Sequence, residues 1–488
     1  MIEFKTRYPN RFDEREQPYF DAFKAQCDAI NARGPIDVEA MINGTIDPNT
    51  PGLGPALPCT KEMLDYYALR YNPEDPLFND DKYARRFGYK STPAMLAFAA
   101  HDDTFMVPVP RAARDVMLVS GLNHSVTALA PIYSGDTLYL VADNRHFTDL
   151  TPESGSEYRT IAIETRGSIY NQNGEKVNEV IFRVCENLKT YKDGMKPAPD
   201  PDHPDDIGWE GPPWKRREDH KYTDEDWDLI RSVWANENMR GETPLYYEDV
   251  NIGDEPNWTI DGPIDDSLEP IPNWGMGLGG TRTLRREIMD PEIFKTMVRN
   301  PVDGIYRLPK RSMSFPAYPA YAAKLMDIKD PKDFAACIAE NSEPFNVFEM
   351  NTSFAENDDP ACEPPERFML INFYGRDFAQ RHFTNWCGAH GWVKNIRWGI
   401  MPDLCMKHYG YDLPTNPEAL SFMDPYPEMK GKCIHHGMER DIMLIKSKVY
   451  DKHIENGEHL VELVWWIESI IGDVFEEGQA TVRLPSRE

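Results

Sequence analysis

The feature of this sequence that most constrains its fold is a strand–turn–strand pattern that occurs twice. Residues 163–184 are IETRGSIYNQNGEKVNEVIFRV, and residues 461–484, close to the C-terminal end, are VELVWWIESIIGDVFEEGQATVRL. In each segment two apolar runs flank a glycine-centred turn, which is the pattern of a β-hairpin. Because apolar residues fall at matching places in the two segments, the sequence predicts two copies of one α+β unit.

Other segments predict the rest of the secondary structure from their composition and periodicity. Strands are expected at 116–129, 137–141, 158–170, 177–184, 441–450, 459–471 and 474–484. Helices are expected at 62–70 and 80–87, and the apolar stretch 94–100 is expected to be the continuation of a central helix. Thr223, followed by three acidic residues, has the composition of a helix start.

The predicted organisation is two units separated by a linker. We expect a helical N-terminal extension over 1–60 that ends in a Pro- and Gly-rich loop at 48–58, a first unit over 61–190, a linker and helix over 191–240, and a second unit over 241–488. The linker prediction rests on 196–217, where prolines and acidic residues show no periodicity. The segment 273–367 is too long for an ordinary loop and is predicted to be an insertion in the second unit.

The charge composition argues against nucleic acid and anionic membranes as partners. The 488 residues include 81 acidic and 53 basic ones, a net charge of −28 that would repel nucleic acid and anionic membranes. No apolar run reaches the ~18 residues of a membrane span, and the first residues lack the apolar core of a signal peptide. We therefore expect a soluble, cytoplasmic protein.

Cysteine and histidine spacing gives no sign of a metal site. The eight cysteines are scattered without a C-x-x-C pair, which predicts reduced, partly buried thiols. His435 and His436 lack a third ligand at useful spacing. The Gly- and Arg-rich stretch 275–286 could cradle phosphates, although it lacks a nucleotide-binding spacing. We expect neither a metal nor a cofactor.

Several segments resemble one known family in their order along the chain. These are DPLFNDDKYARRFGYKSTPAMLAF (75–98), PIYSGD (131–136), IYNQNGEKV (169–177), LYYEDVNIGDEPNWTIDGPI (245–264) and GQATVRLPSR (478–487). They are similar to the MaoC-like acyl dehydratases, and the resemblance covers about two-thirds of the chain. It implies an α+β fold, the tandem (double) hotdog, in which a curved antiparallel sheet wraps a central helix in each unit.

The resemblance also implies an activity, the reversible addition of water to the double bond of an enoyl thioester, usually of coenzyme A. Such chemistry needs a base for the water, an acid for the α-carbon and donors to the thioester oxygen. In R-specific hydratases of this family an Asp and a His five positions apart provide the proton transfers. In the first unit Pro73 and Phe78 occupy those two places, so that unit is expected to shape the acyl pocket.

The second unit contains NFYGRDFAQRHFTNWCGAHGW (372–392), in which Asp377 and His382 have the order and separation of the family's acid–base pair. The Asn-Pro that normally stands between them is absent. On a regular helix five residues correspond to roughly 500° of turn, so the two side chains do not share a face unless the helix begins between them. The structural alternative is two polar helix residues, one solvated and one packed.

Other residues are candidates for contact with the substrate: Tyr374, Arg376, Arg381, Asn385, Trp386, His390 and His124. The two arginines could grip a carboxylate or phosphate oxygen, or could be ion-paired within the protein. His390 lies between glycines and could approach a ligand or be a plain loop residue. For His124 and Trp386 the alternative is a place in the core.

The sequence-based hypothesis is therefore a hydro-lyase acting on an unsaturated or 3-hydroxy acyl substrate, with a coenzyme A thioester as the expected form. Two alternatives stay open: a hotdog enzyme of altered chemistry, acting on a free acid or as a thioesterase, and a non-catalytic acyl-binding subunit. Because hotdog domains commonly assemble through their sheets, we also expect a homo-oligomer, most simply a homodimer.

Overall fold

The fold was analysed in a computed structural model of the whole chain. It describes residues 16–98, 117–149, 158–189, 217–237, 239–264, 285–307, 373–399 and 422–487, together with 361, 364 and 408. Most of the predicted linker and most of the predicted insertion lie outside the described residues.

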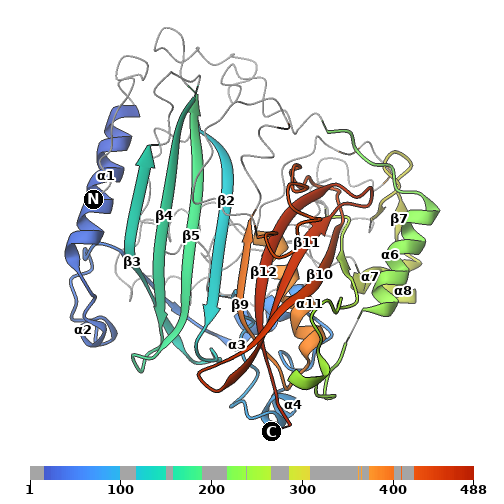
Figure 1. Cartoon of the computed structure of the whole chain (residues 1–488), viewed down its shortest axis with the longest axis horizontal. Coiled ribbons are helices and arrows are strands. Elements are labelled where there is room, and N and C mark those ends of the chain that lie inside the picture. Colours follow the sequence, from blue (N-terminus) through green and yellow to red (C-terminus); the bar gives the residue numbers. More distant parts are fainter. Residues whose placement is uncertain are drawn as a thin grey trace.

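One antiparallel sheet of ten strands dominates the structure (Figure 1). Its order is β1-β3-β4-β5-β2-β9-β12-β11-β10-β6. The strands of the first half are β1 (Leu53–Pro58), β2 (Met117–Ala128), β3 (Thr137–Asp149), β4 (Tyr158–Tyr170) and β5 (Lys176–Lys189). Those of the second half are β6 (Thr259–Asp261), β9 (Trp392–Gly399), β10 (Met443–Glu455), β11 (Glu458–Glu468) and β12 (Val474–Leu484).

The two halves of the sheet have the same topology. Numbered within each half, the strands run 1-3-4-5-2 from either edge, and the two second strands, β2 and β9, pair at the centre. The predicted repeat corresponds to the hairpins β4–β5 and β11–β12, which occupy equivalent places. The expected α+β fold with a tandem hotdog arrangement is therefore confirmed.

The helix of the second half is α11 (Phe373–Cys387), which packs against β9, β12 and β10 (Figure 1). Its apolar side chains Phe378, Ala379 and Phe383 are completely buried in the main core. The first half contributes α3 (Lys61–Tyr71), which contacts α11. Residues of the first half between Lys61 and Phe98 therefore pack on α11, the helix of the second half.

The remaining elements lie around this core. In the first half they are α1 (Glu16–Arg33), which packs on β3, α2 (Val38–Ile42) and α4 (Asp81–Arg86). In the second half they are α6 (Asp224–Asn236), η3 (Tyr247–Asp249), α7 (Arg285–Met289), α8 (Pro291–Phe294) and the small hairpin of β7 (Val298–Arg299) and β8 (Tyr306–Arg307). The predicted helix start at Thr223 is confirmed: Asp226 N–H donates to Thr223 Oγ1 at 3.2 Å and Thr223 N–H to Asp226 Oδ2 at 2.7 Å.

Two local predictions are wrong. The loop expected at 48–58 includes β1, whose residues Leu53 and Ala56 to Pro58 pair with β3. The expected central helix at 94–100 does not form in its described part, residues 94–98, because Pro93 forms a bridge with Tyr133 and Ala94 N–H donates to Ile132 O at 2.8 Å. Both segments are held by pairing with residues distant in sequence.

None of the helices among the described residues has the length and apolar character needed to cross a membrane. Cys27, Cys59, Cys387 and Cys433 are buried cysteines, and the other cysteines lie outside the part of the chain whose side chains are described.

The seam between the half-sheets gives a stability test. Ile396 on β9 is completely buried and pairs with Val126 on one side and Ala480 on the other. We expect Ile396→Ala to cost about 2–5 kcal/mol of folding free energy through the lost apolar contact and the cavity left behind. Its control is Ile454→Ala on β10, where the side chain is 59% exposed and the change should be below about 0.5 kcal/mol.

The midpoint of urea unfolding, followed by circular dichroism, measures both changes. Equal midpoints for the two variants would contradict the role of Ile396 at the seam.

Candidate active site

Helix α11 carries two arginines, an aspartate and a histidine into the interior. Arg376, Asp377, Arg381 and His382 are each at most 2% exposed. A buried charge is tolerated only when it is paired and hydrogen-bonded, so the partners of these residues define what the region can do.

These residues fall into two groups on different sides of α11. The helix is continuous from Phe373 to Cys387, so Asp377 and His382 are separated by roughly 500°, that is, about 140° around the axis. Asp377 and His382 accordingly have different partners. The structure does not bring the two predicted acid–base residues into hydrogen-bond contact.

The first group, here called the carboxyl cluster, consists of Arg376, Asp377, Tyr67 and Glu476. Arg376 Nε donates to Asp377 Oδ1 at 2.6 Å, and both side chains are completely buried. The phenol of Tyr67 reaches this place from α3; burial and the negative charge of Asp377 raise its pKa well above the usual value. Tyr67 is therefore a neutral hydroxyl beside the carboxylate.

Glu476 completes the carboxyl cluster from β12. Its carboxyl group packs directly on Gly375 of α11, at a place where any side chain on residue 375 would collide with it. Burial, together with the charge of Asp377, raises the pKa of Glu476 well above its usual value, while Arg376 opposes the shift. Glu476 is thus a buried acid that favours the protonated form.

Aromatic rings form one wall of the carboxyl cluster. The guanidinium of Arg376 lies 5.0 Å from the ring centroid of Trp398, and the His124 ring stacks on the same Trp at 4.9 Å. Burial, followed by Arg376, lowers the pKa of His124 well below its usual value, so the imidazole is neutral. His124 occupies a core position, in agreement with the structural alternative for this residue.

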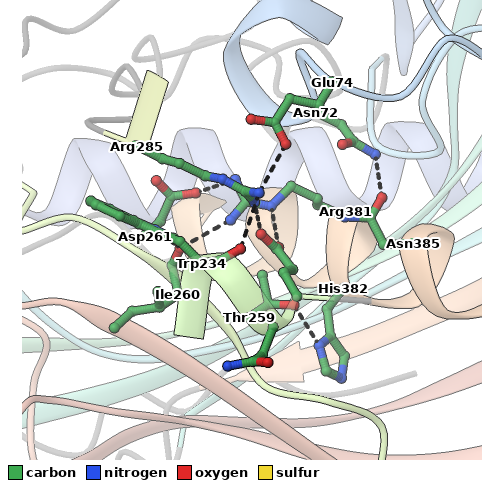
Figure 2. Close-up of polar contacts among 12 residues, drawn as sticks. Asn72, Glu74, Trp234, Thr259, Ile260, Asp261, Arg285, Arg381, His382 and Asn385 are labelled. Atoms are coloured by element: carbon green, nitrogen blue, oxygen red, sulfur yellow. Dashed lines mark hydrogen bonds and ion pairs between the residues drawn. The ribbon is translucent and has the colours of Figure 1, made fainter. Parts of the chain in front are cut away.

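The second group is the arginine network, which consists of Arg381, Arg285, Glu237, Asp261 and Glu74. Figure 2 labels all of these residues except Glu237. Arg381 donates to Glu237 Oε1 at 3.1 Å, to Ile260 O at 3.0 Å and to Asp261. Arg285 pairs with Glu237 as well, and with Glu74 Oε2 at 2.9 Å. Burial and the charge of Arg381 lower the pKa of Arg285 to about 10.

His382 lies next to the arginine network and bonds to two hydroxyl groups. Its Nδ1 is 2.9 Å from Thr259 Oγ1 on β6, and its Nε2 is 2.7 Å from Ser447 Oγ on β10. Burial, followed by the charge of Arg381, lowers the pKa of His382 to about 3. The ring is therefore neutral near pH 7, with one nitrogen a donor and the other an acceptor.

A crevice of about 60 Å³ opens on a third stretch of α11. Its walls are mostly apolar and come from both halves, for example Leu77, Met95, Ile132 and Trp392, and its polar groups are Asn178, Gln380 and Thr384. Gln380 Nε2 is 3.5 Å from Tyr67 Oη, so one side chain separates the crevice from the carboxyl cluster.

The other predicted contact residues are spread over different places. Asn385 accepts a hydrogen bond from Asn72 Nδ2 at 3.1 Å, and Trp386 is in the main core. His390 is exposed and meets Phe87 edge-on with ring centroids 4.9 Å apart. The side chain of Tyr374 lies outside the described residues.

The histidine pair and the Gly- and Arg-rich stretch that were considered as metal and phosphate sites show no such site among the described residues. His435 Nε2 is 3.5 Å from Asp473, and His436 is buried. The stretch 275–284 lies outside the described residues, and Arg285 next to it is ion-paired in the arginine network. Within the described ranges no cluster of three or more His, Cys, Asp or Glu could hold a metal ion.

The sequence analysis missed Glu476 and Tyr67. A signal for Glu476 was present, because strand alternation puts it on the same face as Ala480 and Val482, both of which are buried in the main core. An acidic residue on the apolar face of a predicted strand is a candidate functional group. Tyr67 had no such signal, since nothing in the sequence places α3 beside α11.

Comparisons with known proteins give similarity at the level of solved structures. No family model matches the sequence, and the search of curated proteins gives no match. One similar structure is a MaoC-like dehydratase that is 12% identical, with 88% of this chain and 96% of that chain covered at a TM-score of 0.39. Another is a conserved protein from Mycobacterium tuberculosis with a double hotdog fold. It is 11% identical, and the match covers 88% of this chain and 94% of that chain at a TM-score of 0.38.

A third is a MaoC-like dehydratase from Phytophthora capsici, 11% identical, with 92% of this chain and 98% of that chain covered and a TM-score of 0.32.

The arginine network provides a prediction about stability. Replacing Arg381 by Met leaves the buried carboxylates of Glu237 and Asp261 without this partner, and we expect a loss of about 3–5 kcal/mol. The matched control is Arg86→Met, which removes a pair with Glu242 whose two side chains are 57% and 49% exposed. That change should cost no more than about 1 kcal/mol.

Urea unfolding of the two variants separates these outcomes. Similar small losses in both would show that the buried pairs do not depend on Arg381.

Proposed function

We propose that this protein is a hydro-lyase that adds water to, or removes it from, an unsaturated or 3-hydroxy acyl thioester, with coenzyme A the expected carrier. Three features support the proposal: the sequence resemblance to MaoC-like acyl dehydratases, the duplicated hotdog topology, and a carboxylate buried where the two halves meet. The single observation that carries it is Asp377, held by Arg376 beside the Tyr67 phenol.

Asp377 has the properties of a general base. Arg376 fixes its Oδ1 by a charge-assisted hydrogen bond at 2.6 Å, while Oδ2 has no hydrogen-bond partner among the described residues. An unengaged carboxylate oxygen can accept the proton of a water molecule that attacks the β-carbon. The neutral Tyr67 is a hydroxyl donor within the same cluster.

The crevice is the proposed site for the acyl chain. Its apolar walls suit a hydrocarbon chain, and Gln380 connects it to Tyr67 at 3.5 Å. A 60 Å³ volume suits a short segment of chain, so binding of a longer acyl group requires the walls to part. Asn178 and Thr384 are the polar side chains available there to orient the substrate.

His382 is the proton donor that the family resemblance implies. Its neutral ring carries an N–H proton that it can deliver, and Thr259 and Ser447 orient the ring by bonding to its two nitrogens. In this proposal Asp377 takes one proton from the attacking water and His382 supplies one to the α-carbon. Asp377 then loses its proton to solvent and His382 regains one from solvent, so one water molecule is added and both side chains return to their starting states.

One observation favours a second function, thioester hydrolysis. The 2.7 Å contact between His382 Nε2 and Ser447 Oγ is the geometry of a base that activates a hydroxyl nucleophile. By contrast, both arginines of α11 are already ion-paired with internal carboxylates, which argues against a free-acid substrate.

An activity assay separates these functions. The protein is incubated with aliphatic and aromatic enoyl-coenzyme A thioesters, and hydration is followed by loss of the enoyl absorbance while free thiol reports hydrolysis. We expect hydration, and we expect Asp377→Asn and His382→Ala each to lower kcat/KM by about 100-fold or more.

Two further variants make the result specific. Ser447→Ala should abolish any release of thiol and should lower hydration far less than His382→Ala does, because it removes only a hydrogen bond that orients His382. Asp249→Asn, an exposed carboxylate paired with Arg487, serves as the unchanged control. Release of thiol that depends on Ser447 and not on Asp377 would replace hydration by thioester hydrolysis, and no turnover at all would favour the acyl-binding role.

A further inference from the structure

The side-chain amide of Gln380 is a polar group in the wall of the crevice. Gln380 is on α11 and is only 1% exposed. It follows Asp377 by three positions, so the two side chains are about 60° apart around the helix axis and lie on one side of it. Buried polar groups are as a rule hydrogen-bonded, so the partners of this amide show which of its atoms a ligand can use.

Two contacts define the orientation of the Gln380 amide. The backbone N–H of Ala97 donates to Gln380 Oε1 at 3.2 Å, and because an N–H needs an acceptor, the amide oxygen is turned towards Ala97. The amide nitrogen Nε2 contacts Tyr67 Oη at 3.5 Å, at the long limit of a hydrogen bond. Since an amide nitrogen carries two hydrogens, Gln380 keeps donor capacity that a ligand in the crevice can use.

The crevice wall has two other polar side chains, and both are engaged within the protein. Thr384 Oγ1 donates its single hydrogen to Gln380 O at 2.7 Å. Asn178 Nδ2 donates to Leu96 O at 3.3 Å and so holds the segment that forms part of the wall. Among the described residues, Gln380 is the one of these three that bonds to the carboxyl cluster, through Tyr67.

We propose that the Gln380 amide donates a hydrogen bond to the carbonyl oxygen of the thioester, which it holds beside Tyr67. The proposal rests on the proposed function and supplies the donor that its chemistry requires. When Asp377 takes a proton from water, the water oxygen bonds to the β-carbon and the electrons of the double bond shift, so that negative charge collects on the thioester oxygen. The N–H of Gln380 stabilises this enolate until the α-carbon receives a proton and the carbonyl group is restored.

A neutral amide is suited to this place because it needs no counter-charge. Both arginines of α11 are paired with internal carboxylates, so their charge is already engaged. The bond from Ala97 holds the amide in one orientation before the substrate arrives, which is the condition for efficient stabilisation of a developing charge. The long contact with Tyr67 is weak and is readily exchanged for a shorter bond to a negatively charged oxygen.

A thioester that cannot be hydrated tests this contact without any turnover. Butyryl-coenzyme A labelled with carbon-13 at the carbonyl is added to the full chain, and the C=O stretch of the bound ligand is measured by difference infrared spectroscopy. Because a hydrogen bond weakens the C=O bond, we expect this band at lower wavenumber in the wild type than in Gln380→Met. The control Asn257→Leu removes an exposed amide that donates to Asn236 O, and it should keep the wild-type band.

A second variant serves if Gln380→Met folds poorly. Gln380→Glu keeps an oxygen acceptor for the N–H of Ala97 and replaces the amide donor by a titratable group. At low pH its protonated carboxyl group donates, so the C=O band should match the wild type. As the pH rises and the carboxyl group ionises, the donor is lost and the band should move to higher wavenumber.

Kinetics separate this role from a structural one. With enoyl-coenzyme A substrates we expect Gln380→Met to lower kcat by about 100-fold or more and to leave KM nearly unchanged, because the oxygen becomes charged only in the transition state. If Gln380 served only to hold Ala97 and the crevice wall, its loss would raise KM instead, and Gln380→Glu would behave as the wild type at every pH.

An unchanged C=O band in Gln380→Met, a band independent of pH in Gln380→Glu, or failure of butyryl-coenzyme A to bind the wild type would overturn the proposal. A displaced band together with no hydration of any enoyl thioester would keep Gln380 as the thioester donor and reject the proposed hydro-lyase. A displaced band together with the lower kcat would support both.

Discussion

The rest of the structure depends on the pairing of β2 with β9. This ladder joins two half-sheets of identical topology into one, with Val126 opposite Ile396 and His124 opposite Trp398. The side chain of Asn395 reinforces the seam by donating to Ser125 Oγ at 2.9 Å, Val126 O at 3.0 Å and Thr127 Oγ1 at 2.7 Å. Because the halves are joined there, α11 of the second half is enclosed by elements of both.

Enclosure explains why α11 has so many internal ion pairs. A helix in the middle of two packed units has no solvent-facing side on which to place charges, so Arg376 and Arg381 must be neutralised by carboxylates inside the protein. The two arginines are neutralised by carboxylates in different places. Arg376 uses its sequence neighbour Asp377, whereas Arg381 uses Glu237 after α6 and Asp261 on β6. The pairing of Arg381 fastens segments that are far apart in the sequence, and through Arg285 it extends to Glu74 of the first half.

Much of the strand pattern was predictable because hairpins are local. The turn at Gly174 and the one at Gly457 both connect strands with an apolar alternation that identifies them. The cap at Thr223 was equally local. By contrast, β1 contains two prolines and a glycine in six residues, a poor strand composition, and it becomes a strand through its pairing with β3. The apolar run after Pro93 was predicted as a helix for its composition, but its backbone is held by Tyr133 and Ile132.

The sequence by itself determined the duplicated unit and the α+β class, because periodicity and turns are properties of neighbouring residues. It predicted that Asp377 and His382 diverge if both lie on one regular helix, and the continuous helix from Phe373 to Cys387 meets that condition. Only the tertiary structure decided what each residue meets. It placed Asp377 near Tyr67 of α3 and Glu476 of β12. It placed His382 in hydrogen-bond contact with the hydroxyl groups of Thr259 on β6 and Ser447 on β10. Those partners lie at least 65 residues away in the sequence, and the closure of the two half-sheets around α11 brings them together.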